Sequence, residues 1–292
     1  MAKTETTTKL LARFGRLNSQ RVNWENHWQE VADYMMPRKA NITKRRTRGD
    51  KRNELIFDSS PLQALELLAA SLHGMMTNPS TPWFTLKFKD AQMDQNDEAK
   101  LWLESVTADM YTAFNRSNFQ QEIFELYHDL ITFGTAAMYI EEDDEDLLKF
   151  STKHIAEIFI AEDDKGRIDT VYRKFTLSAR ALVQKFGNKV SQNIKVMSEK
   201  DPYQDVDILH CVYPRADFNP KLKDQENMPF ESVYLEMGSG DELSVSGFKE
   251  FPYVVPRYLK ASHEIYGRSP AMTALPDVKM LNEMSKTTIK AA

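Results

Sequence analysis

Six consecutive carboxylates, from Glu141 to Asp146, form the densest group of potential metal ligands in this 292-residue sequence. Hard divalent cations bind several oxygens at once, so this run, completed by His128 or His154, is a candidate centre for a metal-dependent hydrolase. The run lies between two strand-like segments, however, and none of the six histidines has the spacing of paired metal ligands on one helix face. A solvated hairpin turn is therefore the favoured interpretation of these carboxylates, and the hydrolase is the weaker alternative.

Other catalytic signals are absent from the sequence. It has no Gly-rich phosphate loop and no Gly-x-Ser-x-Gly motif, and it contains only ten glycines. The single cysteine, Cys211, excludes an internal disulfide and lies in the strand-like run DVDILHCVYP, where a small buried hydrophobe is expected rather than a reactive thiol. We therefore predict that the chain is not an enzyme and has no catalytic residue, no cofactor and no metal site.

Positive charge is concentrated at the start of the chain. Residues 1–52 contain 13 Lys/Arg and 5 Asp/Glu, a net charge of +8, whereas residues 53–292 carry a net charge of −13. The segment PRKANITKRRTRGDKR lies in a predicted basic loop over residues 37–53. Because it lacks base-stacking aromatic residues, a solvated loop without a ligand is as well supported as a loop that binds DNA. The side chains that could instead neutralise DNA phosphates are Arg45, Arg46, Arg48, Lys51 and Arg52.

A second charged pattern lies near the end of the sequence. Lys279, Glu283, Lys286 and Lys290 follow each other at steps of four, three and four residues, which places them on one face of a helix. In a single chain this face would be exposed to solvent, with Glu283 pairing to both Lys279 and Lys286. If many copies packed side by side in a ring, the same lysines would form a charged wall. All three lysines are therefore candidate DNA-facing residues.

The helix that carries this stripe has a clear start and no clear stop. Ser269 is a good N-cap, and Pro270 suits the first helical position. Pro276 lies further inside, where we expect a kink or a break. The last turn contains no Gly, Asn or Pro to end it. We therefore expect the sequence to be a truncated part of a longer chain in which the helix continues.

Helical periods dominate residues 1–133. Apolar residues recur at steps of three and four from Leu10 to Met35, with Arg21 in one of the expected positions, and this stripe predicts a long amphipathic helix. Trp24 and Trp28, one turn apart on it, are expected in the core or in a subunit interface rather than in a ligand cage. Further helices are predicted over residues 60–76, 96–114 and 119–133, and the alternating run WFTLKF predicts a strand over residues 83–88.

From Gly134 onward the pattern shortens towards a period of two, and β-branched and aromatic residues gather between turn signals. One helix interrupts, over LSARALVQKFG, with Gly187 in the C-cap position. The predicted fold class is therefore α+β, with a helical first half, a strand-rich second half and a closing helix. Strands are expected over residues 135–142, 147–152, 158–163, 168–175, 205–215, 230–237, 242–248 and 253–260.

Several stretches resemble the head-to-tail connecting, or portal, proteins of short-tailed phages. YGRSPAMTALPDVKMLNEM resembles the segment in which a Gly-Arg-Ser turn, here Gly267, Arg268 and Ser269 followed by Pro270, opens a helix of the portal wall. RVNWENHWQEVADYMMP resembles the family's opening helix, LLAASLHGMMTNPSTPWFTL its second helix and following strand, and ITFGTAAMYIEED its passage from helix to strand. The similarity runs in the same order over nearly the whole chain, so it is more specific than any one motif.

The resemblance implies a structural subunit of a homo-oligomeric ring, with twelve subunits in this family, at one vertex of the capsid. Terminase would drive double-stranded DNA through the ring during packaging, the DNA would leave through it during ejection, and capsid, scaffold and tail proteins would bind it. Such a protein belongs to the virion and is assembled in the host cytoplasm. No run of 18 apolar residues is present, so we expect no membrane partner.

The resemblance also implies how the chain is organised. Residues 1–133 would form the helical part of a wing, residues 134–262 its strand-rich part, and residues 263–292 the start of the stem or channel-wall helix. Family members continue beyond this helix into a second half. A stand-alone DNA-binding adaptor that uses the basic loop remains an alternative to the portal subunit.

Overall fold

The computed structural model describes residues 5–44, 47, 49–89, 96–222 and 224–292. The chain folds as two compact units, of which unit 1 combines residues 1–27 with 156–253 and unit 2 combines residues 28–155 with 254–292. The first helix, α1 (Glu5–Met35), contributes its beginning to unit 1 and its end to unit 2. Helices precede antiparallel strands and a closing helix, which confirms the predicted α+β class.

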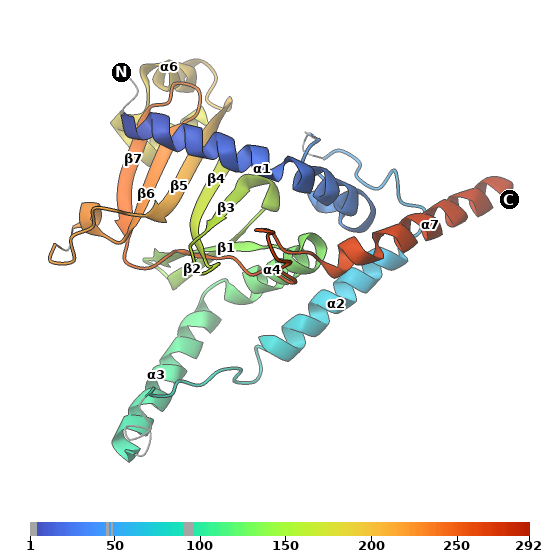
Figure 1. Cartoon of the computed structure of the whole chain (residues 1–292), viewed down its shortest axis with the longest axis horizontal. Coiled ribbons are helices and arrows are strands. Elements are labelled where there is room, and N and C mark those ends of the chain that lie inside the picture. The colour runs from blue at the N-terminus through green and yellow to red at the C-terminus, as the bar shows by residue number, and fades with distance from the viewer. Residues whose placement is uncertain (1–4, 45–46, 48, 90–95, 223) are drawn as a thin grey trace. The chain divides into compact units, whose positions relative to one another are not determined.

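Unit 1 is built on a five-stranded antiparallel sheet with the strand order β3-β4-β5-β6-β7 (Figure 1). Each strand pairs with the next one along the chain, as local connections between antiparallel strands allow. The strands lie close to the predicted positions. Their bounds are β3 Ile158–Glu162, β4 Ile168–Ser178, β5 Asp205–Pro214, β6 Phe230–Glu236 and β7 Glu242–Phe248.

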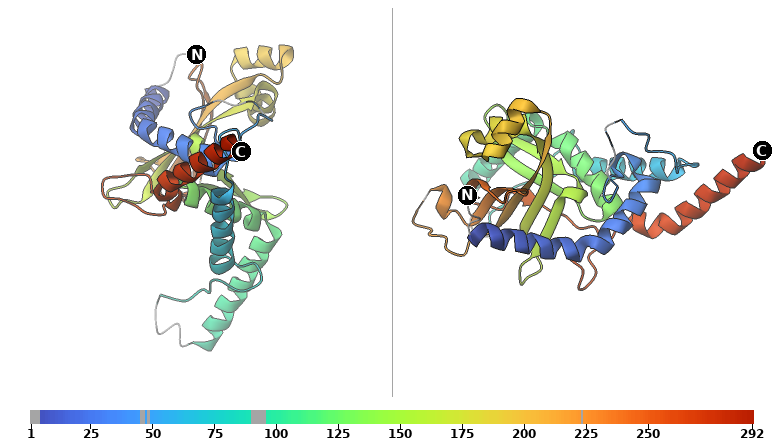
Figure 2. Two further views of the ribbon diagram at one scale, coloured as in Figure 1. Left: turned by 90° about the vertical axis from the view of Figure 1, so that its right-hand side faces the viewer. Right: turned by 90° about the horizontal axis from the view of Figure 1, so that it is seen from above.

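Helices cover both faces of this sheet, as the view from above shows (Figure 2). Leu209 and Cys211 of β5 pack with the apolar residues of α1, whereas Ile208 packs with α5 (Ala179–Phe186) and α6 (Gln192–Lys200). This alternation is the period of two expected for a strand between two layers. Cys211 is fully buried, as predicted, and burial raises the pKa of its thiol well above the ordinary value.

Arg21 keeps its place in the buried stripe of α1 although it is charged, and it is only 1% exposed. Its guanidinium donates hydrogen bonds to the carbonyl oxygens of Ala156 and Ile158. It also pairs with Glu25 at 2.9 Å and lies 3.9 Å from the centre of the Phe159 ring. A buried charge is tolerated when its donors are satisfied in this way. Arg21 therefore ties the middle of α1 to the start of β3.

Helix α6 is a second helix in a region where the sequence predicts only one. It is nine residues long and has a single buried residue, Ile194, so it lacks a repeating apolar stripe. Its N-cap is the available signal, because Ser191 Oγ accepts a hydrogen bond from the Ile194 amide at 3.3 Å. The prediction missed α6 because periodicity is weak in so short a helix.

Unit 2 is mainly helical and contains a three-stranded sheet with the order β2-β1-β8. The helix α4 packs against α2, α7 and the strands β1 and β2. Its residues Phe119, Ile123 and Leu126 form one core with Met138 of β1 and Phe150 of β2. The bounds are α2 Ser60–Met76, α3 Asp97–Arg116, α4 Phe119–Phe133, β1 Ala137–Asp143, β2 Leu147–Lys153, β8 Tyr253–Val254 and α7 Pro270–Ala291.

Residues 83–88 do not form the strand that their alternation predicts. The segment runs along α3, where Tyr111 Oη accepts a hydrogen bond from the Phe84 amide at 2.7 Å. Thr107 Oγ1 accepts one from the Leu86 amide at 3.4 Å. An extended segment becomes a strand only beside another strand, and among the described residues none pairs with it. The prediction was wrong because alternation reports an extended backbone and not its partner.

The predicted strand over residues 253–260 is also mostly absent. The structure has the two-residue β8 and isolated bridges at Arg257 and Leu259. Pro256 lies between these pieces and has no amide hydrogen to donate, so a continuous ladder is interrupted there.

The closing helix is not broken at Pro276. The sequence predicts a kink or a break there, and because helix α7 continues from Pro270 to Ala291, the break is wrong and the kink stays a prediction. Pro276 is exposed, while Leu275 and Val278 beside it are buried and α7 packs against α4. Burial of these neighbours offsets the one helical hydrogen bond that proline removes.

Candidate wall helix and basic loop

The first residues of α7 are fixed to the end of α4 by a buried hydroxyl group. Ser269 caps the helix, because its Oγ accepts a hydrogen bond from the Met272 amide at 3.0 Å. The same hydroxyl donates to the carbonyl oxygen of Thr132 at 2.8 Å. Pro270 follows at the first helical position, as predicted. One side chain therefore caps α7 and holds it against α4.

Two glycines meet just before this cap. Gly134 has a left-handed backbone with φ at 74°, and a Cβ on it would lie 2.3 Å from the carbonyl oxygen of Gly267. A Cβ on Gly267 would lie equally close to the Gly134 carbonyl oxygen. The Gly267 amide also donates to Thr135 Oγ1 at 2.8 Å. Since neither position has room for a side chain, both must be glycine for the two backbone segments to touch.

Arg268, the middle residue of the turn, contributes mainly through its backbone. Its amide donates to the carbonyl oxygen of Leu259 at 2.7 Å. Its exposed guanidinium pairs with Glu264, and the hydrogen bonds of this pair lower the pKa of the Glu264 carboxyl. Such a surface pair adds little to stability.

Helix α7 is buried at its start and exposed towards its end. Leu275 and Val278 are buried, whereas Met280, Met284 and Ile289 are 60% to 62% exposed. In both figures of the fold, the last turns of α7 extend past the other helices of unit 2 (Figures 1 and 2). The end of α7 therefore presents apolar side chains that the described part of unit 2 does not cover.

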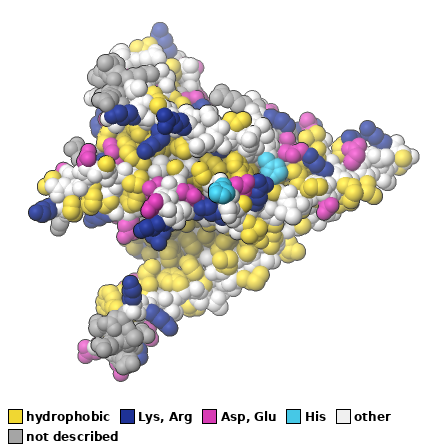
Figure 3. Space-filling model, in the orientation of Figure 1, with side chains coloured by type: hydrophobic (Ala, Val, Ile, Leu, Met, Phe, Trp, Pro, Cys, Tyr) yellow, Lys and Arg dark blue, Asp and Glu magenta, His cyan; other side chains and the backbone are white. Residues whose placement is uncertain are grey.

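The three lysines predicted to face DNA have different environments. Lys279 forms an ion pair with Glu30, so the predicted pair between Lys279 and Glu283 is wrong. Lys286 pairs with Glu283 at 2.9 Å, as predicted. Lys290 is exposed and has no ion pair with a described residue. Figure 3 shows basic and acidic side chains mixed near the end of α7.

A buried amide side chain fixes the first half of the basic loop to α1. Gln29 Oε1 accepts hydrogen bonds from the amides of Ile42 and Thr43, both at 2.9 Å. Its Nε2 donates to the carbonyl oxygen of Ala40 at 3.1 Å. This part of the loop is therefore held in one conformation by the helix that precedes it.

A charge cluster joins the start of the loop to α4. Lys39 contacts the carboxylates of Asp129 and Glu125, and Arg38 binds Glu125 at 2.9 Å. Burial raises the pKa of Asp129 to about 6. Desolvation also acts on Glu125, but hydrogen bonds from Arg38 and Lys39 outweigh it and lower the Glu125 pKa to about 2. These two cations are thus paired within the chain.

Of the five loop residues predicted to contact DNA, Arg45, Arg46 and Arg48 lie outside the described residues. Lys51 is exposed. Arg52 donates a hydrogen bond to the carbonyl oxygen of Arg38, which brings the end of the loop back to its start.

Replacing Asp129 by asparagine should change how stability depends on pH. The Asp129 pKa rises from 3.8 to about 6 on folding, so the folded state holds this proton more tightly. The unaltered protein should therefore lose stability relative to Asp129→Asn as the pH rises from about 4 to about 6, with a constant difference above about pH 7. Urea unfolding of both proteins across this range measures the effect. A difference that does not change with pH would contradict it.

Asn282 of α7 holds the segment that follows the basic loop. Its Oδ1 accepts hydrogen bonds from the amides of Phe57 at 2.7 Å and Asp58 at 3.3 Å. Its Nδ2 donates to the carbonyl oxygen of Leu55 at 2.8 Å. Asn282 is only 7% exposed, so these backbone groups would lose a buried partner without it.

We expect Asn282→Ala to release this segment from α7 at a local cost of about 2 kcal/mol, because it leaves buried backbone groups unpaired. Hydrogen exchange at the Phe57 amide should become faster in the variant. Lys290→Ala, an exposed change on the same helix, serves as the control and should leave the Phe57 rate unchanged. Equal rates in the two variants would show that Asn282 does not hold the segment.

The two tryptophans of α1 differ in burial. Trp28 is fully buried, and its Nε1 donates to the carbonyl oxygen of Phe133 at 3.0 Å. Its ring meets the Tyr266 ring edge-on, with the centres 5.0 Å apart. Trp24 is half-buried. Trp28 therefore belongs to the core of unit 2, where it contacts the end of α4.

The acidic run ends β1 with Glu141, Glu142 and Asp143 and forms the turn to β2 with residues 144–146, which confirms the predicted hairpin. Asp143 accepts hydrogen bonds from the amides of Glu145 and Asp146 within the turn. His128 instead contacts Glu66, and His154 contacts the carbonyl oxygen of Lys39. Among the described residues, no group of three or more His, Cys, Asp or Glu side chains is arranged to hold a metal ion.

Comparison with known proteins decides between the alternatives left open by the sequence. The family model described as "Bacteriophage head to tail connecting protein" matches residues 7–292. The chain belongs to this family. The resemblance seen in the sequence is thereby confirmed, and neither the hydrolase nor the stand-alone adaptor is supported.

Two curated relatives of the chain come from phages. The chain is 35% identical over 286 residues to the "Probable portal protein" of Bordetella phage BPP-1. This match covers 96% of the chain and 52% of that protein. The chain is also 35% identical over 292 residues to the "Portal protein" of Salmonella phage epsilon15. This match covers 98% of the chain and 52% of that protein. The chain thus spans about half the length of the relatives it matches.

Several anchoring residues of the chain were not predicted from the sequence. Gln29 and Asn282 are polar residues on otherwise apolar helix faces, and that interruption was the available signal. The contact of Gly134 with Gly267 joins positions far apart in the sequence and left no local pattern. No helix among the described residues is long and apolar enough to cross a membrane.

Proposed function

We propose that the chain forms the wing and the start of the channel wall in a ring-shaped phage portal. Residues 1–262 would supply the wing and residues 263–292 the start of the wall helix. The observation that carries this proposal is 35% identity, over nearly the whole chain, to two proteins named as portal proteins. The firm attachment of α7 at its start and its exposure further on support the same role.

The function is geometric and electrostatic, and the chain makes or breaks no bond. Double-stranded DNA passes through a ring of identical subunits, twelve by resemblance to the family, while terminase, capsid or scaffold and tail proteins bind outside it. The protein is then a component of the virion that is assembled in the host cytoplasm. Together these roles make the chain a structural part of the machinery for genome packaging and ejection.

Within this ring, Lys290 is the strongest candidate for facing DNA. It is exposed and has no ion pair with a described residue, whereas Lys286 shares its charge with Glu283. Lys279 is paired with Glu30 and contributes least. The loop residues Arg45, Arg46, Arg48, Lys51 and Arg52 provide a second set of phosphate contacts.

A salt titration tests the DNA-facing lysines. Assembled rings of the double variant Lys286→Ala/Lys290→Ala should bind DNA with a shallower dependence on salt concentration than unaltered rings, because fewer counterions are released. Rings carrying Lys279→Ala should retain most of the original slope, since that charge is already paired. An unchanged slope in the double variant would remove both lysines from the DNA-facing set.

The portal role itself is tested in a phage that carries this gene. A nonsense codon early in the reading frame should give heads that contain no DNA and bear no tails. Supplying the intact protein from a plasmid should restore filled, tailed particles. Filled and tailed particles without the protein would overturn the proposal.

A further inference from the structure

The segment from Trp83 to Phe88 has the form of a strand and lacks a strand partner among the described residues. Its exposure alternates, because Phe84, Leu86 and Phe88 are half-buried while Thr85 and Lys87 are exposed. This is the pattern of a strand with one face on a core.

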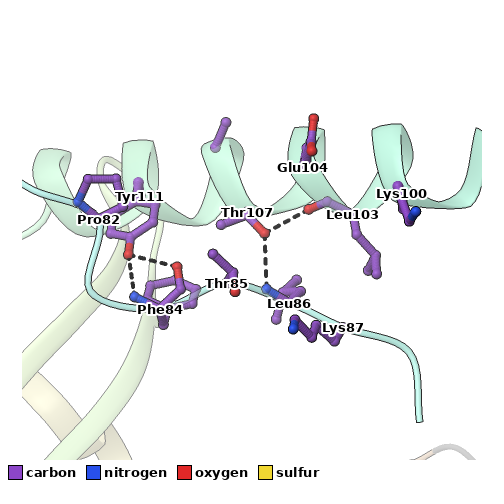
Figure 4. Close-up of a pocket in the computed structure, with 11 residues that line it drawn as sticks. Pro82, Phe84, Thr85, Leu86, Lys87, Lys100, Leu103, Glu104, Thr107 and Tyr111 are labelled. Atoms are coloured by element: carbon purple, nitrogen blue, oxygen red, sulfur yellow. Dashed lines mark hydrogen bonds between the residues drawn. The ribbon is translucent and has the colours of Figure 1, made fainter. Parts of the chain in front are cut away.

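Side chains of α3 already bind the backbone hydrogen-bonding groups along one edge of this segment (Figure 4). Tyr111 Oη accepts a hydrogen bond from the Phe84 amide at 2.7 Å and donates one to the Phe84 carbonyl oxygen at 2.9 Å. Thr107 Oγ1 accepts from the Leu86 amide at 3.4 Å and donates to the carbonyl oxygen of Leu103 at 2.7 Å. The α3 side chains thus replace a neighbouring strand along this edge.

The start of the segment is held firmly in place. The Trp83 ring stacks on Phe119 with the ring centres 5.9 Å apart and meets Tyr111 edge-on at 6.2 Å. Phe84 stacks on Tyr111 with the centres 4.5 Å apart. These contacts already order the backbone of the segment. Binding of a partner strand would therefore cost the segment little conformational entropy.

The opposite edge has no hydrogen-bonded partner in the part of the chain that the structure describes. The Trp83 and Phe84 amides both donate to Tyr111 Oη, so the alternation begins at Phe84. From there the Phe84 and Leu86 amides face α3, and in an extended backbone the Thr85 and Lys87 amides then point to the opposite edge. Within the described part of the chain, neither residue forms a hydrogen bond. An open, ordered strand edge is a template for another extended segment.

We propose that the edge formed by Thr85 and Lys87 binds an extended segment of a neighbouring copy of this chain, by addition of a strand. This proposal rests on the proposed ring. A closed ring brings different surfaces of adjacent copies together, so this edge meets another part of its neighbour and not itself.

The charge around the edge favours another copy as the partner. Lys87 and Lys89 are exposed on the segment and form no ion pair with a described residue. Residues 53–292 carry a net charge of −13, so acidic side chains outnumber basic ones in this part of a neighbouring copy. Like-charged edges repel, which discourages pairing of this edge with its own counterpart.

A groove lies on the α3 side of the segment, opposite the edge at which the added segment would pair, so strand addition leaves it uncovered. Its volume is about 550 Å³, and it lies between the segment and α3. It is lined mainly by apolar or aromatic side chains, among them Pro82, Phe84, Leu86, Leu103 and Tyr111. The affinity of strand addition therefore comes from the backbone hydrogen bonds of the edge itself.

Hydrogen exchange in assembled rings and in dissociated subunits tests this proposal, with protein expressed from the full reading frame that contains this sequence. The Thr85 and Lys87 amides should exchange at least about tenfold more slowly in the ring. The Phe84 and Leu86 amides, already bonded to α3, should change much less. Rings without added protection at Thr85 and Lys87 would overturn the inference and leave the portal proposal intact.

A pair of variants provides the second test. Thr85→Pro removes one open amide and is compatible with an extended backbone, so the subunit should fold normally while its assembly weakens at least about tenfold. Thr85→Ala keeps the amide and should assemble like the unaltered protein. Equal assembly of the two folded variants would refute strand addition. Protection of the Thr85 and Lys87 amides that arises only when a tail or scaffold protein is added would refute it as well.

Failure of the unaltered protein to form any ring would instead overturn the portal proposal.

Discussion

Gly134→Ala should destabilise unit 2 by about 3 kcal/mol or more, the largest effect expected for a single methyl group in this chain. The methyl group would lie 2.3 Å from the Gly267 carbonyl oxygen, and the backbone at this position has φ at 74°. Neither side of the contact can move freely, because both partners are backbone. Relief of the clash would separate the turn before α7 from the end of α4.

Hydrogen exchange of the α4 amides measures this loss. Gly49→Ala is the matched control, since Gly49 also has a positive φ, 85°, but no atom of the described residues lies within 4 Å of where the methyl group would be. The control should cost only the conformational penalty, about 1 kcal/mol. If Gly134→Ala costs no more than Gly49→Ala, the close contact of the two glycines does not hold α7 in place.

Trp28→Ala should cost about 4 kcal/mol, because it removes a fully buried indole from unit 2. It also leaves the Phe133 carbonyl oxygen without the indole donor, which lies 3.0 Å away in the unaltered protein. Trp28→Phe should cost less, since it keeps most of the packing against Tyr266 and loses only the hydrogen bond and part of the volume.

The control for Trp28 lies on α3. Trp102 is 60% exposed, so Trp102→Ala should change the stability of unit 2 by no more than about 0.5 kcal/mol. Urea unfolding of the three variants ranks the effects. A loss for Trp28→Ala as small as that for Trp102→Ala would contradict its place in the core.

Much of the fold was predictable because local periodicity reflects burial. The stripe from Leu10 to Met35 predicts α1, and the strands of unit 1 follow segments of alternating pattern. Arg21 shows the limit of this reasoning. It interrupts the apolar pattern, yet it is buried, because carbonyl groups from a distant part of the chain satisfy its guanidinium.

The errors arose where the outcome depends on distant partners. Residues 83–88 have the composition of a strand, but α3 side chains occupy one edge. Pro276 weakens a helix locally, while burial of its neighbours keeps α7 intact. Similarly, Lys279 pairs with Glu30 of α1 rather than with Glu283 one turn away. In each case a tertiary contact outweighs a local preference.

The candidate site was predictable in outline and not in detail. The turn at Ser269 and Pro270 was found because caps have local signatures. The polar anchors were not: Gln29 holds the basic loop and Asn282 the segment that follows it, and a single polar residue in a helix does not reveal its partner.

Electron microscopy of the protein expressed from the full reading frame that contains this sequence tests the portal proposal most directly. The account predicts closed rings with a central channel, in which α7 from every subunit lines the wall and Lys290 faces the opening. Particles that are monomeric, or rings in which α7 lies on the outer surface, would contradict it.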